Sequence, residues 1–165
     1  MKLREMEMFS LHKTSLQNPL SSKLFDESTF YEAFIDDLRH AKKEVIIESP
    51  YITCRRVNQL LPILKKLVKH GVKVTINTRN PQHYDELLRI QAYMTFNILK
   101  PTGVKIRTFN DYHHRKISVI DSRILYEGSL NILSQYHSCE IMRRIESEEL
   151  NMQMIYFLGL KRFYW

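Results

Sequence analysis

Short apolar runs alternate with longer amphipathic stretches along this chain, and that alternation restricts the fold more than any other feature. The runs EVIIESPYI (44–52), VKVTINT (72–78) and VKIRTF (104–109) have the length and composition of buried strands. Apolar residues at helical spacing precede the first run, in 31–41, and separate the others, in 57–68 and 87–98. This order predicts an α/β fold: a mixed, largely parallel sheet flanked by helices on both faces.

Local signals place the ends of several elements. Pro50 is expected to stop the first strand, and Gly71 to end the second helix. Pro62 is expected in the first turn of that helix, which would delay its start. The polar segment Lys13–Lys23 is interpreted as a loop.

The second half of the chain predicts antiparallel structure. The runs KISVID (116–121) and ILYEG (124–128) are expected to form a hairpin whose turn is residues 121–123. CEIMRRI (139–145) favours a further strand, and apolar residues in 150–158 favour a closing helix. The length and the 44% hydrophobic content fit a single domain over residues 1–165.

Charge and cysteine content indicate the class of partner and the setting. The net charge of +7 favours a polyanion, either nucleic acid or an anionic membrane surface. Cys54 and Cys139 lie far apart, so neither a zinc site nor a disulfide framework is expected, and a reduced, cytoplasmic setting fits. Glu5 and Glu7 interrupt any signal sequence, and no run reaches the roughly 20 apolar residues of a membrane span, so no membrane anchor is expected.

Polar side chains recur at regular intervals in residues 113–134. His114 and Lys116 are two apart at the mouth of a predicted strand, so both should point to the same face. His113 should face the other side, and therefore cannot easily share a metal ion with His114. Asp121 has the opposite parity and should point away from the pair. No metal site or cofactor is predicted.

Ser129 and Asn131 are again two apart, directly after Gly128, which is expected to allow a sharp turn. Together with His114 and Lys116 they offer an imidazole, an ammonium, a hydroxyl and a carboxamide, a set that suits a tetrahedral phosphate. Lys116 and Asn131 can donate to its oxygens, while His114 can attack phosphorus or transfer a proton.

This spacing resembles a family signature. The pattern His114-x-Lys116, four residues, Asp121, six residues, Gly128-Ser129-x-Asn131 is similar to the HxK(x)4D(x)6GSxN motif of the phospholipase D superfamily. The resemblance is closest to the short members with one motif, which include bacterial endonucleases and mitochondrial cardiolipin hydrolase-like proteins. It implies a phospholipase D-like fold and metal-independent phosphodiester cleavage through a phosphohistidine.

The resemblance also implies roles for individual residues. His114 would be the nucleophile, Lys116 and Asn131 would hold the non-bridging oxygens, Ser129 would assist, and Asp121 would support the site. Family nucleases carry an acidic residue shortly after the motif that orients the histidine, and Glu140 stands in that region. An ordinary surface carboxylate is the alternative for Glu140.

The two-step reaction needs a second histidine to protonate the leaving oxygen, and this chain has one motif. A symmetric homodimer with the motif beside its two-fold axis would supply both imidazoles. Lys116 should lower the pKa of His114 and Glu140 should raise it, so the two copies could share one proton.

Ligands in such sheets bind at the carboxyl ends of strands, so the loop after the first strand, SPYITCRR (49–56), is the expected rim of the site. Four arginines flank this rim and favour nucleic acid as substrate, with little sequence preference: Arg55, Arg56, Arg143 and Arg144. DNA is the first expectation. A phospholipid phosphodiesterase, an RNA nuclease and an inactive nucleic-acid-binding dimer remain alternatives. Residues 161–165, KRFYW, could stack on bases or pack at a dimer interface. The sequence leaves open an association with an ATPase or helicase.

Overall fold

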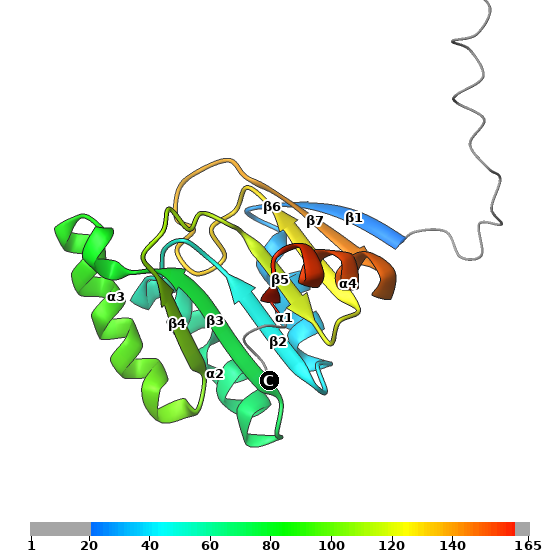
Figure 1. Ribbon diagram of the computed structural model, residues 1–165, viewed down its shortest axis with the longest axis horizontal. Helices are drawn as coiled ribbons and strands as arrows, with labels where there is room; N and C mark the ends of the chain where they lie inside the picture. The colour runs from blue at the N-terminus through cyan, green and yellow to red at the C-terminus, as the bar shows by residue number, and fades with distance from the viewer. Residues whose placement is uncertain (1–20, 161–165) are drawn as a thin grey trace, which may run out of the picture.

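The computed structural model describes residues 21–160, which form a seven-stranded sheet with helices on both faces (Figure 1). The strands are β1 (Ser21–Asp26), β2 (Glu44–Glu48), β3 (Lys73–Arg79), β4 (Lys105–Phe109), β5 (Ile117–Ile120), β6 (Ile124–Gly128) and β7 (Ile141–Glu146). The helices are α1 (Phe30–Arg39), α2 (Cys54–Lys69), α3 (Glu86–Leu99) and α4 (Glu148–Phe157), with short 3-10 turns η1 (Pro81–His83) and η2 (Lys100–Thr102). The predicted α/β class is confirmed.

The strand order is β1-β7-β6-β5-β2-β3-β4, and the sheet is mixed, as predicted. The parallel share is smaller than predicted: β2, β3 and β4 run parallel, while the pairs β1–β7, β7–β6, β6–β5 and β5–β2 are antiparallel. Parallel neighbours need a crossover of a dozen or more residues, usually a helix, and in the described residues such crossover helices occur only before β4. The turn at 121–123 can join antiparallel strands only.

Each face of the sheet has its own core. Val45 and Ile47 of β2 point to the side covered by α1, α2 and α3, where most of the buried side chains lie. Ile46 points the other way, into a smaller cluster with Ile155 of α4. Figure 1 shows α4 alone in front of the sheet and α1 and α2 behind it. Helices therefore cover both faces, as predicted.

Helix α2 starts earlier than predicted and keeps Pro62 in its interior. Thr53 has an extended backbone, and its carbonyl accepts from the Val57 N–H at 3.0 Å, so the helix begins at Cys54. A proline within a helix deprives the residue four positions earlier of a hydrogen bond. That residue, Asn58, is exposed, so water can solvate its carbonyl.

Strand β1 was not predicted, because the loop interpretation of Lys13–Lys23 extended into it. Most of its side chains are exposed, so it carries no clear apolar alternation. The strand exists because it pairs along the whole of β7, from Ser21 opposite Glu146 to Asp26 opposite Ile141. The rest of that predicted loop, and residues 161–165, lie outside the described residues.

The predicted hairpin is confirmed. Asp121 and Ser122 both have positive φ, 55° and 53°, and join β5 to β6. The Arg123 N–H donates to the Ile120 carbonyl at 3.0 Å, and Ile120 pairs with Ile124, so residues 121–123 form the loop. Aspartate tolerates the left-handed region better than most residues.

Candidate active site

The motif begins in the extended stretch that leads into β5. The Lys116 ammonium donates to His114 Nδ1 at 2.7 Å and to the His114 carbonyl oxygen at 2.8 Å. The two side chains thus lie together, as expected for residues two apart on an extended chain. His113 points to the opposite side, where it is buried and its ring stacks on Phe109 at 5.0 Å between centroids.

Two cations act on the His114 ring. Partial burial, followed by Lys116 and Arg79, lowers the pKa of His114 below its usual 6.5, which favours the neutral imidazole at physiological pH. Burial also lowers the pKa of Lys116, and Glu140 opposes that shift. A neutral imidazole beside an ammonium is suited to attack on an anionic phosphate ester.

Gly128 is required at the end of β6 for a reason that differs from the predicted turn. Its φ is not positive, but a Cβ there would overlap the Ile141 carbonyl oxygen and lie 2.8 Å from the Met142 sulfur. The next residue joins the same contact: the Ser129 N–H donates to the Ile141 carbonyl at 2.9 Å, and the Ile141 N–H donates to Ser129 Oγ at 3.1 Å. The motif's glycine and serine therefore bind the site loop to β7.

Asn131 lies in a loop that is tied to the end of β2. The Leu133 N–H donates to Ser49 Oγ at 3.1 Å, and the Thr53 N–H donates to the Leu133 carbonyl at 2.9 Å. The carboxamide oxygen of Asn131 is buried and has no hydrogen-bond partner within the described residues. Buried polar atoms in folded proteins usually have partners, so this oxygen is free to accept from a ligand or water.

Asp121 follows β5, at the opposite end of that strand from Lys116. Its carboxylate accepts three backbone N–H bonds from the residues that lead into β2: Lys42 at 2.8 Å, Lys43 at 2.7 Å and Glu44 at 3.0 Å. The side chain holds the β5–β6 turn against the start of β2. Its support of the site is therefore indirect.

Glu140 lies on the loop before β7, close enough to Lys116 to affect its pKa. Its carboxylate accepts from Ser138 Oγ at 2.8 Å, and its N–H donates to Glu27 Oε2 at 2.8 Å. Within residues 21–160 no hydrogen bond joins Glu140 to His114, so the predicted orienting contact is not made in the single chain.

The four predicted arginines separate into two groups. Arg56 packs on the Tyr31 ring at 3.7 Å and donates to the Gln135 carbonyl at 2.7 Å. Arg144 forms an ion pair with Asp37 at 2.7 Å, and a second one with a glutamate of its own strand. Both guanidinium groups hold the fold together, which leaves them poorly placed for the predicted substrate contact.

The other two arginines are exposed. The Arg55 guanidinium lies over the Tyr136 ring at 4.4 Å. Arg55 comes from the segment after β2, and Tyr136 from the segment after the GSxN part of the motif. Arg143 projects from β7 and donates to Ser22 Oγ at 3.1 Å. Arg55 is thus the better placed of the two for a substrate that enters beside the motif.

Sequence reasoning missed other side chains around His114. Arg79 ends β3, affects the pKa of His114 and lies 5.8 Å from the Tyr112 ring, which is 91% exposed. Tyr51 meets the His114 ring edge-on, with centroids 6.3 Å apart. The rule that ligands bind at the carboxyl ends of parallel strands could have identified Arg79. Tyr51 lies within the expected rim, 49–56.

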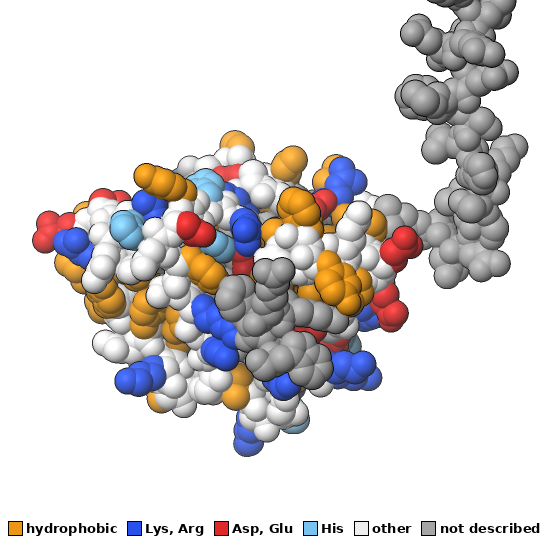
Figure 2. Space-filling view, in the orientation of Figure 1, with side chains coloured by type: hydrophobic (Ala, Val, Ile, Leu, Met, Phe, Trp, Pro, Cys, Tyr) orange, Lys and Arg blue, Asp and Glu red, His pale blue; other side chains and the backbone are white. Residues whose placement is uncertain are grey.

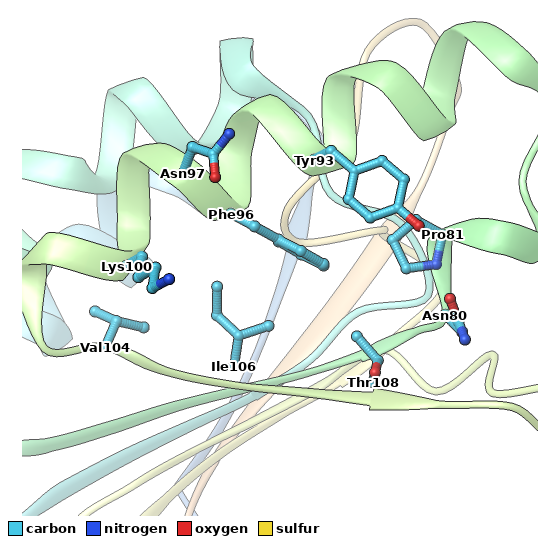
Figure 3. A pocket seen from close by; sticks show the side chains of 9 residues that line it. All are labelled: Asn80, Pro81, Tyr93, Phe96, Asn97, Lys100, Val104, Ile106 and Thr108. Carbon is cyan, nitrogen blue, oxygen red and sulfur yellow. The ribbon is translucent and has the colours of Figure 1, made fainter.

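Charged and aromatic side chains intermix around this end of the sheet. Figure 2 shows histidines together with Lys and Arg at the upper part of this face. A separate hollow of about 450 Å³ lies between α3 and β4, with Tyr93 and Phe96 facing Ile106 and Thr108 (Figure 3). No motif residue lines that hollow. Among the described residues, no group of three or more His, Cys, Asp or Glu side chains could bind a metal, and no helix is long and apolar enough to span a membrane.

The family model described as "Cardiolipin synthase, PLD-like domain" matches residues 34–158, most of the chain. The chain belongs to the phospholipase D superfamily. It carries a phospholipase D-like phosphodiesterase domain, which agrees with the resemblance found in the motif.

Curated relatives and solved structures in this superfamily differ in length. A cardiolipin synthase of Clostridium perfringens is 29% identical over 119 residues, which are 68% of this chain and 25% of that protein. The chain therefore spans about a quarter of the length of the curated relatives it matches.

Two solved structures match over most of their own length and over most of this chain. Nuc from Salmonella typhimurium, a phospholipase D family member, superposes with a TM-score of 0.70 at 16% identity, covering 84% of this chain and 91% of that one. NucT from Helicobacter pylori gives a TM-score of 0.65 at 19% identity, covering 84% and 93%. These structures establish the shared fold.

Proposed function

We propose that this chain is an endonuclease that cuts DNA, with little sequence preference, through a phosphohistidine formed on His114 in a homodimeric site. The observation that carries the proposal is the Lys116 ammonium 2.7 Å from the His114 ring, with Arg79 close enough to lower the same pKa. A neutral imidazole surrounded by cations can attack an anionic diester that other nucleophiles approach poorly.

The hydrogen bond between these side chains suggests how the reaction starts. An ammonium can only donate, so His114 Nδ1 accepts, and the neutral ring carries its proton on Nε2. A bound phosphate would draw the Lys116 ammonium to its non-bridging oxygens and release Nδ1. The lone pair of Nδ1 can then attack phosphorus, while Nε2 keeps its proton.

The remaining steps use a second copy of the chain. As the nitrogen–phosphorus bond forms, the bond to the leaving oxygen breaks, and the His114 ring of the second copy, which starts in its protonated imidazolium form, donates a proton to that oxygen. Water then attacks the phosphohistidine, the second imidazole takes the water's proton, and His114 is regenerated. Two copies are required because each offers one motif.

Charge and aromatic side chains support a nucleic acid over a lipid. The net charge of +7 suits a repeating polyanion. Tyr112 and Tyr136, both exposed and both beside an arginine, could stack on unpaired bases. A phospholipid diester is the second candidate, because the curated relatives are named cardiolipin synthases.

Incubation in excess EDTA with single-stranded DNA, duplex DNA, RNA and cardiolipin vesicles tests the proposal. We expect DNA cleavage to persist, because the nucleophile is a side chain. His114→Ala should abolish it and keep DNA binding, while His70→Ala, at the exposed end of α2, should change neither. Loss of cleavage in EDTA with rescue by a metal would reject the mechanism. Cleavage of cardiolipin or RNA alone would reassign the substrate, and binding without cleavage would leave an inactive binding dimer.

The homodimer has its own test. Mixtures of wild-type and Lys116→Ala chains should lose more activity than the wild-type fraction predicts, because each mixed dimer has an incomplete site. The interface should bury more than roughly 1,000 Å² in total, as stable partnerships do. Full specific activity from a protein that stays monomeric at assay concentration would reject the shared site.

A further inference from the structure

The stretch that carries His114 is held by side chains. Residues 111–116 belong to no helix or strand. Among the backbone hydrogen bonds that loops and turns form in residues 21–160, none involves this stretch. The pairing of β5 with β2 ends where Ile117 lies opposite Glu48. Apart from the edge-on contact of its own ring with Tyr51, the position of His114 therefore depends on contacts that its neighbours make.

One buried carboxyl group contacts both neighbours of His114. Glu48, the last residue of β2, is 1% exposed. Its Oε2 lies 3.4 Å from His113 Nε2 and 3.5 Å from Arg115 Nη1. Its Oε1 accepts a hydrogen bond from Asn77, directly across the parallel pair β2–β3. Glu48 thus joins two strands of the rigid sheet to both residues that flank His114.

These contacts lie on the opposite side of the sheet from the motif side chains. Glu48 alternates with Ile47 along β2, so it faces the α4 side, with Ile46. His113 and Arg115 point to that side, because they alternate with His114 and Lys116. A diester bound at His114 therefore cannot touch Glu48.

The His113 contact is buried, and it is a close approach rather than a hydrogen bond. The His113 ring is enclosed between Phe109, stacked at 5.0 Å, and the Glu48 carboxyl. Burial lowers the pKa of His113 more than Glu48 raises it, which keeps the ring uncharged. Arg115 is half exposed and permanently charged, so its contact with the Glu48 carboxylate is an ion pair.

We propose that Glu48 is a positioning residue, which fixes His114 and Lys116 in register with the bound phosphate by holding His113 and Arg115 from behind the sheet. The proposal rests on the proposed function, because it assigns Glu48 to the reaction of that site. A displacement near 1 Å at reacting atoms costs on the order of 100-fold in rate. The carboxyl group thus acts on turnover without touching the substrate.

Glu48→Gln tests this, because it keeps the side-chain size and an oxygen for Asn77 while removing the charge that attracts Arg115. We expect kcat on a fluorogenic single-stranded oligonucleotide to fall about 10- to 100-fold with KM changed less than about threefold. Backbone ¹⁵N order parameters of residues 111–116 should fall from about 0.85 toward 0.6. Asp37→Asn is the matched control: Asp37 is largely buried and ion-paired with Arg144, away from the motif, so both readouts should keep their wild-type values.

Wild-type kcat and order parameters in Glu48→Gln would overturn the proposal, as would equal losses in Asp37→Asn. If Glu48→Gln does not fold, Arg115→Met removes the half-exposed partner of the Glu48 ion pair and is judged by the same two measurements, kcat and the order parameters. If the wild-type chain cleaves no diester, the proposed function fails, and the order parameters still decide whether Glu48 holds the stretch.

Discussion

Replacing Gly128 by alanine should destabilise the protein and remove its activity together. The added Cβ would overlap the Ile141 carbonyl oxygen and lie 2.8 Å from the sulfur and 2.9 Å from the Cα of Met142. Two of these three neighbours are backbone atoms, which cannot move without opening β6 from β7. Overpacking of this kind costs about 1–3 kcal/mol. The two hydrogen bonds between Ser129 and Ile141 would also lengthen, at about 1 kcal/mol each.

Urea and thermal unfolding measure this cost. A loss of about 3–5 kcal/mol predicts a melting temperature lower by roughly 6–20 °C for a chain of this size. Gly71→Ala is the matched control, because Gly71 has φ +82° and an added methyl group would meet nothing within 4 Å, so only the left-handed backbone penalises it. That penalty is about 1–2 kcal/mol, with kcat unchanged. A Gly128→Ala protein as stable as Gly71→Ala, or one with wild-type kcat, would refute the close-contact argument.

Three further outcomes follow from the site. Asp121→Asn should lower the free energy of unfolding by about 1–3 kcal/mol, because the hydrogen bonds from three backbone N–H groups weaken, while kcat of the folded protein should change less than about threefold. A roughly 100-fold loss of kcat would instead place Asp121 in the chemistry. In an NMR titration the pKa of His114 should lie below 6.5 in the wild type and rise in Arg79→Gln. Activity that needs the neutral ring should therefore persist to lower pH in the wild type than in the variant. A wild-type pKa at or above 6.5 would contradict this. Tyr112→Ala should weaken binding of a single-stranded oligonucleotide about tenfold while Tyr112→Phe retains it, and equal affinities would remove this ring from the binding surface.

Local signals predicted most of the elements, and failed where packing partners decide burial. In α3 the apolar spacing identified Leu87, Ile90 and Met94, yet these side chains are 75%, 50% and 55% exposed. The buried face contains Ala92 and Thr95 instead. Small residues let α3 approach α2 closely, and no pattern of large apolar residues can indicate that approach.

The same distinction between local signals and distant partners applies to the residues of the site. His114 and Lys116 could be paired from sequence because two residues of one extended segment share a face. Arg144 could not be assigned, because its partner Asp37 lies on α1, far along the chain. Arg79 was overlooked because the rule for the carboxyl ends of parallel strands was applied to the loop after β2 and not to the end of β3.

The pairing of the first described strand with the last has a consequence for folding during synthesis. β1 lies against β7, with Ser21 opposite Glu146, so β1 has no partner until nearly the whole domain has been translated. At about 5–20 residues per second that delay is on the order of 10 s. The units β2–α2–β3 and β3–α3–β4 need only nearby segments and can form during this interval. We expect the nascent chain to dock β1 last, and a ribosome that stalls before β7 to present β1 as an unpaired strand to chaperones.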